Sequence, residues 1–306
     1  MKIISIYISL LFFTSSIACL GQQMPMFSQY AYNTLAINPA IAGTKDGINA
    51  LMLYRKQWSD YEGAPSTINF SASSNISNGK FGVGVNFVND KIGISNNNTV
   101  QGAFSYILDL NDNLRLSMGM YLSLLNFQHD WGSLRVQHTS DPLFANGKES
   151  LFSFNTGVGA YLYNKRFYVS FSIPNILETK MSNTSESYYL RHYFLKGGVH
   201  FDINQSIEFV PSVLLKYVKN NNIQGDITAT VIFQKMLWFG VSYRSEDGIA
   251  LLSQVVLKER FRIGYAYDYP HTEIQKATSG THEILLGIKI NKKSTPSNII
   301  TSPRYF

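Results

Sequence analysis

Six histidines are the side chains with the greatest potential for metal or proton-transfer chemistry: His129, His138, His192, His200, His271 and His282. No two of them have the spacing that places metal ligands on one face of a helix. His192 and His200 share the parity of a single strand, so both could face the same side of a sheet. Isolated histidines of this kind are usually solvated, and the sequence therefore predicts no metal site.

Other sequence motifs that could indicate ligand binding or catalysis are incomplete or absent. Gly82-Val83-Gly84 resembles part of a phosphate loop, but it lies within a strand pattern instead of opening a helix. Asp109, Asn111 and Asn113 have the spacing of a calcium loop, yet Leu114 occupies the position that requires glycine. No nucleophile elbow is present. We therefore predict a protein without catalytic residues or cofactors, and not an enzyme.

A set of charged residues shares one parity within strand-like segments, opposite to the apolar side chains. These residues are Lys196, Glu208, Lys216, Asp226, Arg244, Arg262, Asp268 and Glu283. In a closed barrel they would point into the lumen, away from lipid. There they could pair with one another across the barrel or hold a plug, and interior salt bridging is the interpretation we favour. Direct contact with a partner or a solute is the alternative.

The elements that position these charges are runs of about ten residues in which apolar and polar side chains alternate. Phe81, Val83, Val85 and Phe87, for example, alternate with small or polar residues. Such alternation is typical of strands with one apolar face. The predicted strands are 48–58, 65–75, 80–89, 98–108, 113–126, 151–163, 166–174, 191–203, 206–218, 223–233, 236–245, 248–257, 260–269 and 281–291. The run 248–257 is exceptional because both of its faces are largely apolar.

The composition favours a membrane barrel over a soluble sheet. Charged residues make up only 15% of the chain, against roughly 25% in ordinary soluble domains. Aromatic residues reach 14%, which suits the aromatic girdles of a transmembrane barrel. A large soluble β-sandwich would also alternate, but its polar face would be richer in Lys and Glu. The predicted fold is an all-β, transmembrane antiparallel β-barrel of about 14 strands.

The connections between the predicted strands are asymmetric. Those after even-numbered strands are uniformly short, whereas several after odd-numbered strands are long, namely 127–150, 175–190 and 270–280. Short periplasmic turns and longer extracellular loops are typical of barrels in the outer membrane. The sequence therefore predicts a location in the cell outer membrane, with both chain termini on the periplasmic side.

The remaining segments flank the barrel, which we assign to residues 48–291. Residues 1–21 have the basic start, apolar core and small-residue end of a signal peptide. We expect cleavage after Gly21, and lipidation of Cys19, the single cysteine, is the alternative. Residues 22–47 mix apolar patches with turn formers and could form a periplasmic or plug-like segment. Residues 292–306 form a C-terminal tail. The formal net charge is +6, but the sequence has no run of basic residues of the kind that binds nucleic acid.

Ordered motifs along nearly the whole mature chain resemble the PorP/SprF family of Bacteroidetes outer-membrane proteins. The motifs are Phe27–Tyr30, Asn38–Ala40, Tyr54–Trp58, Gly63–Pro65, Asn89–Gly93, Arg166–Val169, Ser172–Asn175, Arg191–Phe194, Pro211–Ser212, Lys216–Lys219, Ser242–Arg244, Arg262–Tyr269 and Gly280–Glu283. None of them is catalytic.

The resemblance implies a non-enzymatic barrel of the type IX secretion system. Its expected partners are a secreted cell-surface adhesin, other components of that system and outer-membrane lipid, with no nucleic acid. The resemblance also implies a role in secretion or surface attachment of the adhesin, and a connection with gliding motility. The alternative function is an outer-membrane channel for a small solute, for which the luminal charges and a plug would be suited.

Overall fold

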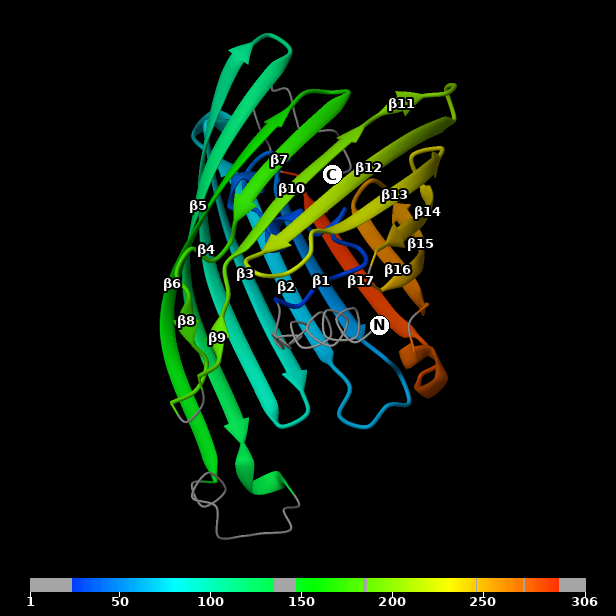
Figure 1. The fold of residues 1–306 in the computed structure, drawn as a ribbon. Coiled ribbons are helices and arrows are strands. Elements are labelled where there is room, and N and C mark those ends of the chain that lie inside the picture. Colours follow the sequence, from blue (N-terminus) through cyan, green and yellow to red (C-terminus); the bar gives the residue numbers. More distant parts are fainter. Residues whose placement is uncertain (1–23, 135–146, 184–185, 246, 272, 292–306) are drawn as a thin grey trace, which may run out of the picture.

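A computed structural model describes residues 24–134, 147–183, 186–245, 247–271 and 273–291. The predicted signal peptide and C-terminal tail lie outside these residues. The strands form one continuous antiparallel sheet that closes on itself, because β1 pairs with β17 and β10 pairs with β12 (Figure 1). Closure leaves no sheet edge around the wall, which a membrane-spanning sheet requires.

The strand bounds agree with the predicted segments to within four residues at either end. The strands are β1 Ile48–Lys56, β2 Ser66–Ile76, β3 Phe81–Ile92, β4 Ser95–Asn111, β5 Leu114–Asp130, β6 Lys148–Tyr163, β7 Phe167–Ile173, β10 His192–Val199, β11 Phe201–Asp202, β12 Ile207–Val218, β13 Gln224–Phe233, β14 Leu237–Arg244, β15 Gly248–Leu257, β16 Phe261–Pro270 and β17 Thr281–Ile290. The two-residue β11 continues β10 beyond His200 and pairs with the same neighbour, β12. The sheet therefore has fourteen barrel strands, which confirms the predicted fold.

A second, small element lies in the connection between β7 and β10. Strands β8 (Thr179–Lys180) and β9 (Tyr188–Tyr189) form a two-stranded sheet there. Five short 3-10 helices complete the described structure: η1 Thr34–Ala36, η2 Pro39–Ile41, η3 Ser77–Gly79, η4 Trp131–Ser133 and η5 Glu273–Ala277. Within the described ranges, no helix has the length and apolar character needed to cross a membrane.

The wall alternates as the sequence predicts, with apolar side chains facing outward. In β14, Phe239, Val241 and Tyr243 are exposed, whereas Trp238 and Arg244 are buried. An aqueous surface covered with large exposed hydrophobic side chains would be unfavourable, but a lipid-facing surface requires them. The sheet therefore has a hydrocarbon-compatible exterior and a polar interior.

The apolar inner face of β15 has a packing explanation. Its inward residues include Ala250 and Leu252, both buried. Leu252 lies opposite Gly240 of β14 and Ala266 of β16, so its side chain fills space that its small neighbours leave empty. Both faces of β15 are apolar because the lumen is packed at this position.

The two ends of the barrel differ, and we name them by their connections. The turn side, at the top of Figure 1, carries short turns such as 112–113 and 258–260, and the loop side, at the bottom, carries the connections that begin after Asp130 of β5 and after Ile173 of β7. Lys258 and Glu259 both have positive φ. Two consecutive left-handed residues characterise a type I′ hairpin turn, whose twist matches that of the strands.

Strands β4, β5 and β6 are longer than predicted. They contain 17, 17 and 16 residues; the extra length of β5 and β6 lies on the loop side, and that of β4 lies at both ends. The expected loops there are correspondingly shorter, and only residues 93–94 separate β3 from β4. About ten residues suffice to cross a bilayer, so these strands continue beyond it as a projecting hairpin.

Replacement of Leu251 by arginine should destabilise the inserted barrel, because Leu251 is 54% exposed on the outer face in the middle of β15. An arginine at the bilayer midplane costs about 2–4 kcal/mol, whereas one near an interface costs about 0–1 kcal/mol. Leu257→Arg, at the turn-side end of the same strand, is the matched control. Urea unfolding in lipid vesicles measures both, and equal losses of stability would contradict the assigned membrane position.

Candidate functional site: a plugged lumen

Residues 24–47 lie inside the barrel, and we call this segment the plug. Almost every plug residue is buried, from Met24 at the loop-side half of the lumen to Thr44 near the turn side. The plug has little regular structure beyond η1 and η2, so its backbone groups need partners on the wall. The polar side chains of the lumen are therefore best described by how they bind the plug.

A cluster of charged side chains lines one side of the lumen, and we call it the charge cluster. Its members, in strand order around the wall, are Lys216, Asp226, Arg244, Asp268, Glu283 and Arg55. All six are buried. Neighbouring strands β12, β13, β14, β16, β17 and β1 supply them, so strand pairing brings together residues far apart in the sequence.

Ion pairs connect the members of the charge cluster. Lys216 Nζ lies 3.2 Å from Asp226 Oδ1, and Arg244 Nε lies 3.6 Å from Asp226 Oδ2. Arg244 also lies 3.2 Å from Asp268 Oδ2 and, through Nη2, 2.8 Å from Asp247 of the adjacent loop. Buried charges are tolerated when they are paired in this way.

Arg55 joins the other end of the charge cluster to the plug. Its Nη1 lies 2.8 Å from Asp268 Oδ2 and 3.2 Å from Glu283 Oε2. The same Nη1 donates to Ser28 Oγ at 2.7 Å. Arg55 therefore contacts both carboxylates and the plug at one point.

Glu283 binds the plug backbone directly. Its Oε2 accepts the N–H of Ser28 at 2.9 Å, and its Oε1 accepts the N–H of Gln29 at 2.8 Å. Ser28 Oγ donates to Asp268 Oδ2 at 2.6 Å. Charge-assisted hydrogen bonds of this type are about twice as strong as neutral ones. The charge cluster thus fastens the start of the plug through both main chain and side chain.

Lys196 of β10, the strand next to β12, holds the plug without a carboxylate. Its Nζ donates to Thr34 Oγ1 at 3.0 Å and lies 5.5 and 5.3 Å from the ring centres of Tyr30 and Tyr168. Cation–π contacts of a desolvated ammonium contribute about 2 kcal/mol. A buried cation is therefore stabilised here by a hydroxyl and two aromatic faces.

Hydroxyl groups of the wall satisfy plug carbonyls further along. Ser172 Oγ donates to Ile37 O at 2.8 Å, Ser105 Oγ donates to Ala42 O at 2.7 Å, and Tyr121 donates to Leu35 O. Unpaired carbonyls in a buried segment are costly, so each of these contacts favours the seated plug.

Asn38 fixes the sharp bend before η2. Its Oδ1 accepts the N–H of Ala40 at 2.8 Å, as an N-cap residue does, and Pro39 occupies the first helical position. Its Nδ2 donates to Ser170 Oγ at 2.7 Å and to Ala160 O at 3.1 Å. The Asn-Pro pair is therefore both a local cap and an anchor to the wall.

Inward-facing glycines let the plug approach the wall closely. A Cβ on Gly119 would lie 2.5 Å from Ala40 N, and one on Gly159 would overlap Asn38 Oδ1. A Cβ on Gly82 would overlap Ala42 O. Glycines within the strands thus provide docking space for the plug, a role that curvature alone would not require.

Two cavities lie on either side of the plug. The loop-side cavity, about 320 Å³, is lined by Phe27, Trp58 and four members of the charge cluster, Arg55, Lys216, Asp226 and Arg244, among others. The turn-side cavity, about 550 Å³, is lined by residues that include Lys45 and Arg262. Plug residues contribute to both linings, so the plug separates the two spaces.

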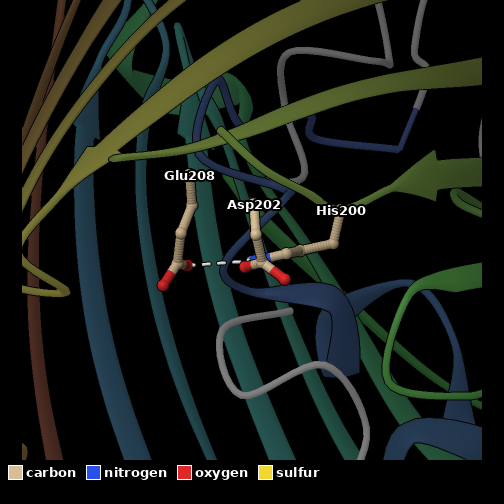
Figure 2. A group of neighbouring side chains, drawn as sticks. All are labelled: His200, Asp202 and Glu208. Atoms are coloured by element: carbon tan, nitrogen blue, oxygen red, sulfur yellow. Dashed lines mark ion pairs between the residues drawn. The ribbon is translucent and has the colours of Figure 1, made fainter. Parts of the chain in front are cut away.

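The structure places all eight sequence-predicted charges on the inner side of the wall. Five of them belong to the charge cluster, and Lys196 contacts the plug. Arg262 stacks on Trp238, with its guanidinium carbon 5.1 Å from the ring centre, beside Tyr32 of the plug. Glu208 lies apart from these, 3.1 Å from His200 near the turn side (Figure 2).

Arg55 is the functional residue that sequence reasoning missed. Its inward neighbours Leu51 and Leu53 are apolar, so the inner and outer faces of β1 could not be told apart by polarity. The pairing of β1 with β17, which aligns Arg55 with Glu283, was the missing information. An arginine at the end of an otherwise apolar strand was the available signal.

A serine–histidine contact occurs on the loop side and has a structural role. Ser95 Oγ lies 2.9 Å from His129 Nδ1, and His129 Nε2 lies 3.1 Å from Met181 O. Because Nε2 must donate to a carbonyl, Nδ1 accepts from the serine. Both side chains are buried, and the contact attaches the β7–β10 connection to the β4–β5 hairpin.

One protein family matches most of the chain. The sequence profile described as "Type IX secretion system membrane protein PorP/SprF" matches residues 20–288. No curated protein sequence matches the chain.

Solved structures of bacterial proteins resemble the chain at very low identity. The toluene transporter TodX of P. putida is 8% identical with a TM-score of 0.51, over 85% of this chain and 94% of that one. A Pseudomonas aeruginosa FadL homologue is 10% identical, with a TM-score of 0.46 over 88% and 94%. Omp33 of Acinetobacter baumannii is 8% identical, with a TM-score of 0.45 over 81% and 100%. The likeness to TodX concerns the fold alone.

Gly119→Ala should destabilise the plugged barrel by about 1–3 kcal/mol, the usual cost of overpacking a filled interior. Its added methyl would meet Ala40 N and the carbonyl carbon of Pro39 at 2.5 and 2.6 Å. Gly102→Ala is the matched control, because the nearest atom to its Cβ is 4.0 Å away. Unfolding followed by tryptophan fluorescence compares the two, and an unchanged Gly119→Ala midpoint would refute close docking of the plug.

Glu283→Ala should loosen the plug, because two backbone N–H groups and Arg55 lose their acceptor. Removing one partner of a buried ion pair typically costs about 3–5 kcal/mol. In a Cys19→Ser background, Ala31→Cys introduces a single thiol at a plug position that is 1% exposed. Maleimide labelling of this thiol should be slow with Glu283 and faster with Glu283→Ala.

Glu186→Ala is the control for that experiment, because Glu186 forms an exposed pair with Lys180 in the β8–β9 connection. It should leave the labelling rate unchanged. Equal labelling with and without the Glu283→Ala substitution, with both barrels folded by their electrophoretic heat-modifiability, would show that Glu283 does not retain the plug.

Proposed function

Because this chain belongs to the PorP/SprF family of type IX secretion system membrane proteins, we propose that it supports the secretion or surface attachment of a partner adhesin. It is a β-barrel of the outer membrane. In this proposal it acts without catalysis, its turn side faces the periplasm and its loop side faces the exterior. The adhesin, together with other components of the secretion system, would be its partners, and gliding motility would be one process that depends on it.

The fastened plug is the observation that carries the proposal. It fills the middle of the lumen and is bound to the wall on several strands, by Glu283, Lys196 and Ser172 among others. A polypeptide in transit would have to displace all of these contacts. The barrel is therefore better suited to hold a partner at its surface than to conduct one through its interior.

The loop side offers a surface for such a partner. Phe152 and Phe154 of β6 are 74% and 75% exposed, more than the lipid-facing residues of β14. β6 pairs with β7 only over Val158–Tyr163, so its loop-side half has no neighbouring barrel strand on that edge. Aromatic side chains that can be buried on contact contribute strongly to protein–protein affinity. We place the adhesin contact on this part of the β5–β6 hairpin.

A solute channel is the second candidate function, and the two cavities are the observation that favours it. Movement of the plug would join them into one path past the charge cluster. Purified protein in planar bilayers separates the candidates. Silent bilayers support the attachment role, and steady conductance that changes with Asp268→Ala or Arg262→Ala supports the channel.

A strain that lacks the gene should synthesise the adhesin but fail to display it on the cell surface. A strain with Phe152→Ser and Phe154→Ser should lose most surface adhesin at an unchanged level of the barrel. The matched control is Phe201→Ser with Phe261→Ser, at two exposed phenylalanines on the turn side. Surface immunolabelling and blotting give both quantities, and normal display in the deletion strain would overturn the proposal.

A further inference from the structure

Strand pairing brings three metal-binding side chains together at the turn side of the barrel. Asp202 of β11 lies directly opposite Glu208 of β12 in the antiparallel register. His200 precedes Asp202 by two residues, so its side chain leaves the same face of the sheet. Figure 2 shows the three side chains pointing toward one another.

The distances between their ligand atoms fit a small cation. His200 Nε2 lies 3.1 Å from Glu208 Oε2 and 3.5 Å from Asp202 Oδ1, and the three ligand atoms lie within 4.8 Å of one another. Ligands bound tetrahedrally at about 2.0–2.1 Å, as on zinc, are separated by about 3.3 Å. Two of the spacings are already close to that value.

Glu208 is the member whose surroundings call for a cation. Its side chain is only 8% exposed, and its buried Oε2 makes no hydrogen bond, although His200 Nε2 lies 3.1 Å away. Its neighbours on the inner face are apolar, with Val210 two residues along and Ile232 directly across the β12–β13 pair. A carboxylate in such a place is costly unless an opposite charge lies beside it.

Two carboxylates opposite each other add to this cost, because like charges at paired positions repel. A neutral imidazole and two carboxylates would balance the charge of one divalent ion. The donor set of one nitrogen and two oxygens suits zinc-class transition metals better than calcium, which prefers six or more oxygens.

We propose that His200, Asp202 and Glu208 form a binding site for a divalent transition-metal ion, with Zn²⁺ as the preferred occupant. The Asp202 side chain is 76% exposed, so the ion reaches the site from the turn side and keeps open positions for water. Its structural effect is to connect the end of the β10 strand, where His200 interrupts the ladder, to the start of β12. The site is independent of the proposed adhesin role.

Isothermal titration of the detergent-purified full chain with zinc sulfate, after chelator treatment and without a polyhistidine tag, tests the site. Wild-type protein should bind one equivalent. His200→Ala and Glu208→Gln should each weaken binding at least about 100-fold, since even loss of an outer-shell partner costs 10–100-fold.

His282→Ala and Glu186→Gln are matched controls, because His282 bonds Tyr265 and Glu186 lies in an exposed pair. Both should bind like wild type. The proposal is overturned if wild-type protein takes up no stoichiometric zinc. It is equally overturned if the two site variants bind as tightly as the controls while remaining heat-modifiable barrels.

Discussion

The contact between Glu283, Arg55 and the Ser28–Gln29 backbone is the interaction on which the lumen depends. A carboxylate and a guanidinium buried in a protein wall are unfavourable unless their hydrogen-bonding capacity is used. Here two backbone N–H groups of the plug donate hydrogen bonds to the Glu283 carboxylate, so the carboxylate and the plug backbone satisfy each other's hydrogen-bonding capacity. Neither the charged wall nor the irregular plug would be satisfied without the other.

The other wall contacts extend the same dependence across the barrel. Lys196 lacks a carboxylate but meets a plug hydroxyl, and serines of β4 and β7 donate hydrogen bonds to carbonyls of the plug. Gly119 and Gly159 remove side chains where the plug backbone comes closest. Charged residues, hydroxyl groups and glycines of the inner face thus each lie where the plug has a matching polar group or comes close to the wall.

The barrel itself could be predicted from sequence because lipid imposes a regular alternation on every strand that crosses it. Prediction was weaker where that constraint ends. Strand β4 begins with Ser95-Asn96-Asn97-Asn98, a polar run that pairs fully with β5 although no alternation marks it. Outside the bilayer the outer face has no need of apolar residues, so the periodic signal disappears while the hydrogen-bonded ladder continues.

The inward direction of the charges was likewise predictable, because parity decides it. Their partners were not, because the partners depend on which strands are neighbours and on how far each is displaced along the barrel. Arg55 and Glu283 meet only through closure of β1 on β17, and His200 meets Glu208 only through the register of one hairpin. A search of hairpin-opposed positions would have found the second pair, whereas closure leaves no local trace in the sequence.

The glycine docking positions have a consequence for biogenesis. A segment whose main chain rests against Gly82, Gly119 and Gly159 on three different strands could not easily be threaded into a cylinder that had already sealed. The N-terminal residues would instead form a core, around which the sheet curls before its first and last strands pair. Insertion into the membrane and filling of the interior then become a single event.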